Sequence, residues 1–205
     1  VIGLSAQAAV LPESRYRYDK HHLVPFGEFI PAGFRWFTER MQIPLGDFDR
    51  GAVAQASLVI GDAATGVERA APNICYEDLF GEELARRFAD PAQAPTLLVN
   101  LSNIGWFGDT IAVAQHLAIS RLRALEFQLP MIRATNTGAT AVIDHRGRVA
   151  AQWPAFAEGV LDGRVHGRHG LTPYARWASR LGLWPLLGAG ALVIAVFARR
   201  RPALR

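Results

Sequence analysis

Apolar runs and helical stretches alternate through the middle of the chain. Short apolar runs at 67–74, 96–101 and 131–135 predict strands. The run at 96–101 is continuous, which is typical of a strand that is buried on both faces. Helical spacing of apolar residues predicts helices at 79–88 and 110–128. This order predicts an α/β fold.

Turn signals before and after this region extend the predicted sheet. A glycine-bounded turn at 61–66 predicts one hairpin, and a turn at 145–148 predicts another. A last short strand is expected at 159–165. Hairpins added to alternating strands and helices predict a mixed sheet with helices on one of its faces.

The predicted helix at 110–128 is the longest in this part of the chain. Apolar residues recur along it at steps of three and four, at Ile111, Ala114, Ala118, Leu122 and Leu125. Such spacing is typical of an amphipathic helix.

The C-terminal tail differs from the rest of the chain. Residues 181–198 carry no charge and are bounded by Arg180 and Arg199. An 18-residue helix spans about 27 Å, which is close to the thickness of the hydrocarbon core of a bilayer. A buried core helix is the alternative, but further arginines follow directly. The pattern predicts a domain over 1–170 and a membrane tail over 171–205, with one transmembrane helix.

The charge is unevenly distributed. The 205 residues have a formal net charge of +4, yet the stretch from 163 onward has eight arginines and no acid. The remaining residues therefore carry about −4. An acidic body argues against nucleic-acid binding, whereas a basic tail fits a membrane surface. The tight arginine cluster at 199–201 favours a cytoplasmic C-terminus.

Cys75 is the sole cysteine and Lys20 the sole lysine. One cysteine excludes an internal disulfide, and it argues against a metal site built on thiolates. Cys75 follows a predicted strand, where the N–H groups of the next turn favour a thiolate, but Glu77 and Asp78 oppose it. A nucleophilic Cys75 would therefore need a nearby cation or base. The alternative is a small buried hydrophobic residue.

Two loops contain further candidates. Glu28 lies in a loop of aromatic, proline and glycine residues, where it either has a partner or faces water. Trp106 and Phe107 lie between two glycines after a strand. They predict either a loop over a pocket or a hydrophobic plug.

Four stretches together form a recognisable set: Tyr18–Pro31, Ile74–Glu77, Asn100–Asp109 and Arg133–Gly138. The set resembles the apolipoprotein N-acyltransferase family of the nitrilase (carbon–nitrogen hydrolase) superfamily. The first stretch is specific to the acyltransferases, and the others are shared more loosely across the superfamily. The resemblance implies a nitrilase-like α-β-β-α sandwich that is incomplete at its N-terminus, with no metal and no cofactor.

The resemblance also implies roles for individual residues. Cys75 matches the family's nucleophile, Lys20 its catalytic lysine, and Glu28 a second glutamate that is important for activity. Tyr76 and Glu77 match residues that flank the nucleophile, and we expect them to bind substrate. The family's general-base glutamate lies upstream, and so do its N-terminal membrane helices. This chain is therefore expected to be a C-terminal portion.

The implied reaction moves a fatty acyl chain from a phospholipid, through a Cys75 thioester, to the N-terminal amino group of a diacylglyceryl apolipoprotein. Trp106 and Phe107 would cover the acyl chain. The implied location is the bacterial inner membrane, with the catalytic domain on the periplasmic side. Two alternatives stay open: a membrane-tethered nitrilase-type amidase, and a non-catalytic membrane-bound module.

Overall fold

The computed structural model describes residues 1–3, 15–34, 36, 40, 48–62 and 66–199. The tip of the first predicted hairpin, at 63–65, and the end of the tail, at 200–205, lie outside the described residues. The prediction of a cytoplasmic C-terminus rests on the arginine cluster at 199–201, of which only Arg199 belongs to the described residues.

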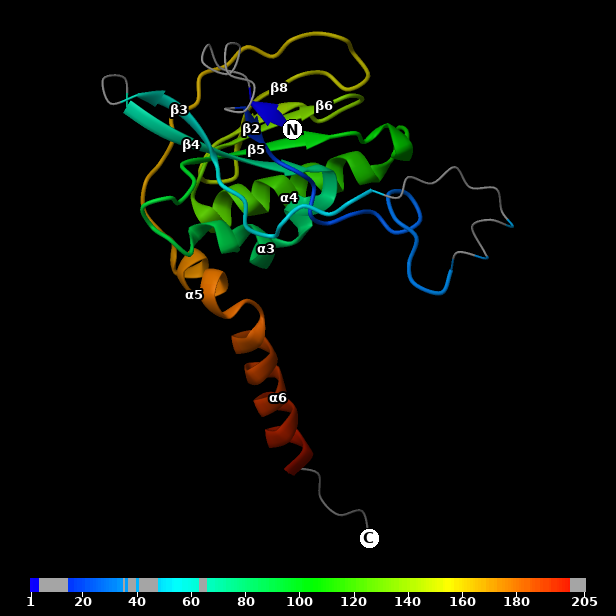
Figure 1. The fold of residues 1–205 in the computed structure, drawn as a ribbon, viewed down its shortest axis with the longest axis vertical. Helices are drawn as coiled ribbons and strands as arrows, with labels where there is room; N and C mark the ends of the chain where they lie inside the picture. Colours follow the sequence, from blue (N-terminus) through cyan, green and yellow to red (C-terminus); the bar gives the residue numbers. More distant parts are fainter. Residues whose placement is uncertain (4–14, 35, 37–39, 41–47, 63–65, 200–205) are drawn as a thin grey trace.

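A six-stranded mixed sheet forms the centre of the fold (Figure 1). Its strands, in spatial order, are β3 (Leu58–Asp62), β4 (Gly66–Ile74), β5 (Leu97–Ser102), β6 (Met131–Thr135), β7 (Ala141–Ile143) and β8 (Val149–Gln152). The three central strands, β4 to β6, pair in parallel, and the outer pairs are antiparallel. Two short strands, β1 (Ile2–Gly3) and β2 (Tyr16–Arg17), form a separate pair. The predicted mixed sheet is confirmed.

Helices lie along one face of this sheet (Figure 1). They are η2 (Cys75–Leu79), α3 (Gly81–Ala85), η3 (Arg86–Phe88) and α4 (Ile111–Phe127), with η4 (Gly105–Phe107) before α4 and α5 (Pro173–Leu181) after the sheet. The helix predicted at 79–88 is therefore three short pieces. Phe80, whose ψ of 76° is not helical, separates the first two. The described residues thus supply one helical layer and one main sheet of the expected sandwich.

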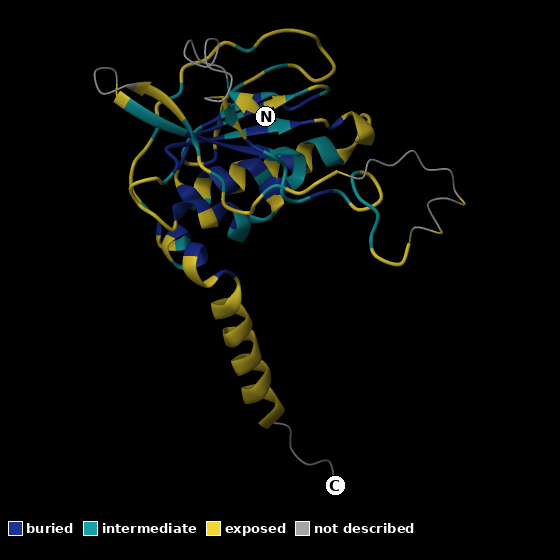
Figure 2. Ribbon diagram, viewed as in Figure 1, coloured by how far each residue is buried: buried dark blue, intermediate teal, exposed yellow. Residues whose placement is uncertain are grey.

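The core lies between the sheet and these helices, as the dark centre of Figure 2 shows. Phe88 and Phe127 stack with ring centroids 4.7 Å apart. Leu98, Met131 and Ile143 from three neighbouring strands are at most 1% exposed. Burial of these large apolar side chains is the main favourable contribution to folding.

The apolar residues that recur at helical spacing do not form the buried face of α4. Ile111 is 74% exposed, and Leu122 and Leu125 are about half exposed. The buried side chains are His116, Ser120, Arg123, Ala124 and Phe127. The reason is that His116 and Ser120, in the middle of α4, contact the buried charges of Asp78 and Arg133. The side of α4 that faces the sheet is therefore partly polar.

The prediction of a strand at 159–165 is wrong. These residues are irregular and mostly exposed, and Val160 is 83% exposed. Leu161 and Val165 are partly buried, but they lie in an irregular backbone and not in a strand.

The tail forms two helices where the sequence predicted one. After α5 ends at Leu181, Gly182 adopts φ of +55°, and α6 (Trp184–Arg199) follows at 88° to α5. Gly182 permits this turn because it has no Cβ. Helix α6 has no buried residue (Figure 2). Within the described residues, no one helix has both the length and the apolar character to cross a membrane, although α5 and α6 meet that test as a bent pair.

Candidate active site

Cys75 lies where β4 ends and η2 begins. Because β4, β5 and β6 are parallel, their carboxyl ends meet at one edge of the sheet, where ligand sites of such sheets usually form. Cys75 is half-buried and has φ of +57°. Non-glycine residues rarely adopt this left-handed conformation, and such exceptions concentrate at functional sites. The sharp turn therefore presents the thiol at the edge of the sheet.

Burial is the main influence on the Cys75 thiol, and it raises the pKa above its ordinary value. The charge of Lys20 and a hydrogen bond from the backbone N–H of Tyr76 lower that pKa, while the carboxylates of Glu28 and Asp78 raise it. The expected N–H contribution and the expected cation are both present, but burial outweighs them. A thiol whose pKa is raised needs a base to become a nucleophile.

Lys20 is fixed beside Cys75 by an ion pair with Glu28. Its Nζ donates to both carboxylate oxygens of Glu28, at 2.7 and 2.6 Å. The Lys20 side chain is only 10% exposed. Glu28 also accepts from the backbone N–H of Val24 at 2.9 Å, which ties the carboxylate to its own loop. The expectation that Glu28 has a partner is confirmed, and the water-facing alternative is wrong.

The ring of Tyr76 lies next to the ion pair of Lys20 and Glu28. The Lys20 ammonium lies 5.3 Å from the centre of the Tyr76 ring, within the range of a cation–π contact. The Tyr76 hydroxyl donates to the carbonyl of Leu23 at 2.8 Å. Burial raises the pKa of Tyr76 to about 12. The expected role of Tyr76 in substrate binding stays a prediction.

Glu77 joins the lysine segment to the nucleophile turn. It is 4% exposed, and its carboxylate accepts four hydrogen bonds. The donors are the Tyr18 hydroxyl at 2.9 Å and the backbone N–H groups of His21, His22 and Ile74 at 2.6, 3.1 and 2.6 Å. The carboxylate therefore points into the protein, and it positions the chain on either side of Lys20 relative to Cys75.

Asp78 belongs to a buried polar network that the sequence analysis missed. Its carboxylate contacts His116 Nε2 at 3.0 Å and accepts from the Ser120 hydroxyl at 2.5 Å. Arg133, which is 1% exposed, lies 2.7 Å from both Ser120 Oγ and His116 Nδ1. Burial lowers the pKa of Arg133, and the charge of Asp78 opposes that effect. The described residues contain no group of three or more His, Cys, Asp or Glu side chains that could hold a metal ion.

Asn100 connects this network to the nucleophile. Its Nδ2 donates to the backbone carbonyl of Cys75 at 2.9 Å and to Asn73 Oδ1 at 2.5 Å. Its Oδ1 accepts from Arg133 Nη1 at 3.0 Å. A signal for this network exists in the sequence: Asn100 and Arg133 interrupt strands that are otherwise apolar, and buried polar groups need partners.

Trp106 and Phe107 lie in η4, which directly follows β5. They are 85% and 55% exposed, so they are not the hydrophobic plug that was one of the two expectations. Exposed aromatic side chains next to a carboxyl-end site are available to an apolar ligand.

Comparisons with known proteins identify the family of this chain. Residues 4–174 match the model of the carbon–nitrogen hydrolase family. The chain is 63% identical over 190 residues to the apolipoprotein N-acyltransferase of Verminephrobacter eiseniae, an alignment that covers 89% of this chain and 34% of that protein. It is 56% identical over 189 residues to the apolipoprotein N-acyltransferase of Ralstonia nicotianae, covering 92% of this chain and 34% of that protein.

The chain thus spans about a third of the length of these relatives. Among solved structures, the NitFhit protein of C. elegans aligns with 67% of this chain and 31% of its own chain, at 22% identity and a TM-score of 0.48.

Proposed function

Because the chain belongs to the carbon–nitrogen hydrolase family, we propose that it is the nucleophile-bearing portion of an apolipoprotein N-acyltransferase. The observation that carries this proposal is the ammonium of Lys20, which Glu28 holds with two hydrogen bonds where its charge acts on Cys75. The high identity to named acyltransferases supports it. The domain would be residues 1–170, and residues 171–205 would form its membrane tail.

In the proposed first half-reaction, the sulfur of Cys75 attacks the ester carbonyl of a phospholipid and forms a tetrahedral intermediate. The thiol proton goes to a general base, which the family resemblance assigns to a glutamate upstream of the residues described here. The base returns that proton to the leaving oxygen, and a lysophospholipid departs. A base is needed because burial raises the pKa of the Cys75 thiol above its ordinary value.

Lys20 would donate a hydrogen bond to the oxyanion of this intermediate. A fixed donor is effective because it needs no reorganisation as charge develops, and the two-point contact with Glu28 provides that fixation. Glu28 acts through Lys20, so we assign it a positioning role.

In the second half-reaction, the free amino group of a diacylglyceryl-cysteine attacks the acyl-thioester. The C–S bond breaks, an amide bond forms, and the amine proton passes through the base to the sulfur. Tyr76 would border the acyl chain, and Trp106 and Phe107 would cover it, because their rings are exposed beside the site. Glu77 would hold the site together, since its carboxylate is occupied by protein donors.

Both substrates are lipids, so the site must work at a bilayer. Exposed apolar side chains along α6 would enter the membrane, and Arg199 at its end would lie at a surface. We place the protein in the bacterial inner membrane, with the catalytic domain on the periplasmic side and the C-terminus in the cytoplasm.

A direct assay separates this function from its alternatives. The longer protein containing this chain is supplied with phospholipid and a diacylglyceryl peptide, and acylated peptide is measured by mass spectrometry. Lipid-dependent acylation supports the proposal. Ammonia release from small amides without acyl transfer would favour an amidase, and no reaction of either kind would favour a non-catalytic module.

A further inference from the structure

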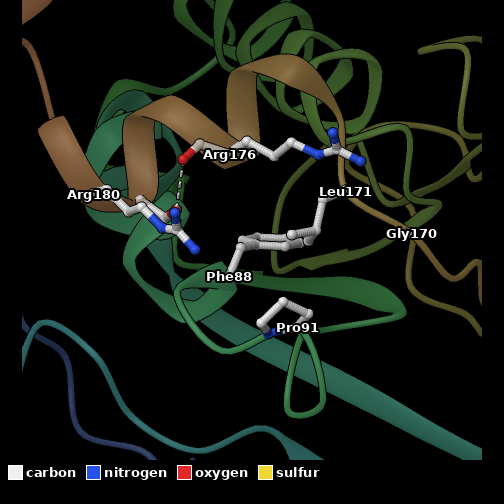
Figure 3. A pocket seen from close by; sticks show the side chains of 7 residues that line it. Phe88, Pro91, Gly170, Leu171, Arg176 and Arg180 are labelled. Atoms are coloured by element: carbon white, nitrogen blue, oxygen red, sulfur yellow. Dashed lines mark hydrogen bonds between the residues drawn. The ribbon is translucent and has the colours of Figure 1, made fainter.

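A cavity next to α5 lies apart from the candidate active site and shares no lining residue with it. Its volume is about 420 Å³, and its walls include Phe88, Pro91 and Leu171. Figure 3 shows the side chains of Arg176 and Arg180 reaching to different sides of this cavity, around the ring of Phe88. The cavity thus combines an apolar interior with two cations.

Arg176 and Arg180 are four residues apart, so they lie on one face of α5. The same two side chains line a second hollow, together with Trp177 and Leu181. Both arginines are exposed, and among the described residues neither guanidinium has an ion pair or hydrogen-bond partner. No acidic side chain lines either hollow. A chemical group that complements this surface carries negative charge and has an apolar part.

A third arginine extends the charge to the turn between α5 and α6. A Cβ placed on Gly182 would lie 3.6 Å from Arg86 Nη2, so the Arg86 guanidinium is beside that turn. Arg86 is also exposed, and no described acid pairs with it. The side chains of Arg86, Arg176 and Arg180 therefore lie near the turn that leads from α5 into α6.

The membrane entry proposed for α6 puts this point at a membrane surface. Its 16 residues span about 24 Å, somewhat less than the roughly 30 Å of hydrocarbon in a bilayer. A helix this short draws the residues before Trp184 toward the headgroup level. Because α5 is bent by 88° from α6, it lies along the membrane surface when α6 crosses the membrane.

We propose that the cavity between Arg176 and Arg180 binds the phosphate of an anionic phospholipid. Guanidinium groups bind phosphate oxygens through paired charge-assisted hydrogen bonds. The first carbons of the acyl chains would contact the apolar wall formed by Phe88 and Leu171. This lipid is structural, distinct from the acyl donor at Cys75, and it fixes the domain on the bilayer. The inference rests on the entry of α6 into the membrane that was proposed above.

The test uses the whole chain in a neutral detergent, with native mass spectrometry to count retained lipid during titration with phosphatidylglycerol. We expect Arg176→Gln/Arg180→Gln to weaken retention by about tenfold or more, since the loss of one charge-assisted hydrogen bond is worth about that factor. The matched control, Arg146→Gln/Arg148→Gln, removes two arginines from the β7–β8 turn, which lines neither hollow. It should retain lipid like the unmodified chain.

Equal loss in both double variants would overturn the proposal, because it would show a response to net charge alone. Displacement of the lipid by inorganic phosphate at similar concentration would also overturn it, because the site would then bind free phosphate. Circular dichroism checks folding, and Arg176→Lys/Arg180→Lys, which keeps the charge, should recover part of the affinity. The readout needs no turnover, so Cys75→Ala should retain lipid normally even if the acyl transfer proposed above fails.

Discussion

The ammonium of Lys20 and the carboxylate of Glu28 form a two-point ion pair, with N–O distances of 2.7 and 2.6 Å. The two charges act on Cys75 in opposite directions, because Lys20 lowers the pKa of the thiol and Glu28 raises it. Together they place a fixed donor where its charge acts on the thiol, and the two opposite charges offset each other. This arrangement suits a group that must stabilise an oxyanion without ionising the resting nucleophile.

Neutralising Lys20 and neutralising Glu28 should therefore shift the pKa of the Cys75 thiol in opposite directions. Lys20→Gln should raise the pKa of the thiol further, and Glu28→Gln should lower it, because each removes one of the opposing charges. The rate of alkylation by iodoacetamide as a function of pH measures this, and the single cysteine makes the label specific.

In the unmodified chain, the alkylation rate should rise with pH through a midpoint above the ordinary thiol value, since a raised pKa delays ionisation. Glu158→Gln, an exposed position outside the site, is the matched control and should leave the profile unchanged. Shifts of the same sign in both variants would contradict the assigned arrangement.

Glu77→Gln should destabilise the protein. The amide keeps the size of the side chain, but it cannot accept from four donors with a full negative charge. We expect the free energy of unfolding to fall by about 2–3 kcal/mol, measured by urea denaturation. Amide hydrogen exchange at His21 and His22 should also become faster. Unchanged protection there would show that Glu77 does not hold the lysine segment.

Asp78→Ala should destabilise the protein more strongly. Asp78 lies 3.7 Å from Arg133, and both side chains are fully buried. Removing the carboxylate leaves a buried guanidinium without its counter-charge, which costs about 3–5 kcal/mol. Asp109→Ala removes an exposed carboxylate and should change stability by less than about 0.5 kcal/mol. Similar midpoints of thermal unfolding for the two variants would count against the network.

Trp106→Ala and Phe107→Ala should separate stability from function. Because both side chains are largely exposed, each substitution should change the free energy of unfolding by less than about 0.5 kcal/mol. Each should nevertheless raise the KM for phospholipid if the rings contact the acyl chain. Leu122→Ala, exposed on the outer face of α4, is a comparable apolar control and should not alter KM.

The sequence predicted the sheet better than the surfaces that the helices bury. Strands such as β5 and β6 follow from local apolar runs, so their predicted bounds agree with the structure within a residue or two. The buried face of α4 could not be predicted, because His116 and Ser120 are buried by contacts with Asp78 and Arg133, which belong to two other elements, η2 and β6. Such contacts leave no periodic signal.

In the candidate site, too, residues with a local sequence signal were predicted, and contacts between separate segments were not. Cys75 and Lys20 were found because each is the sole residue of its type, and Glu28 because it lies in an apolar loop. The inward orientation of Glu77 could not be predicted, because two of its four donors are backbone N–H groups 55 and 56 residues away. The break at Gly182 was missed because the tail reads as one continuous uncharged stretch.

The central claim is that Cys75 carries the acyl group between two lipids. The most direct measurement is the intact mass of the longer protein containing this chain after incubation with phospholipid and without acceptor. The account predicts the added mass of one fatty acyl group, removable by hydroxylamine as a thioester is, and absent from Cys75→Ser. An acyl adduct that persists in Cys75→Ser, or acceptor acylation that proceeds without any adduct on Cys75, would contradict it.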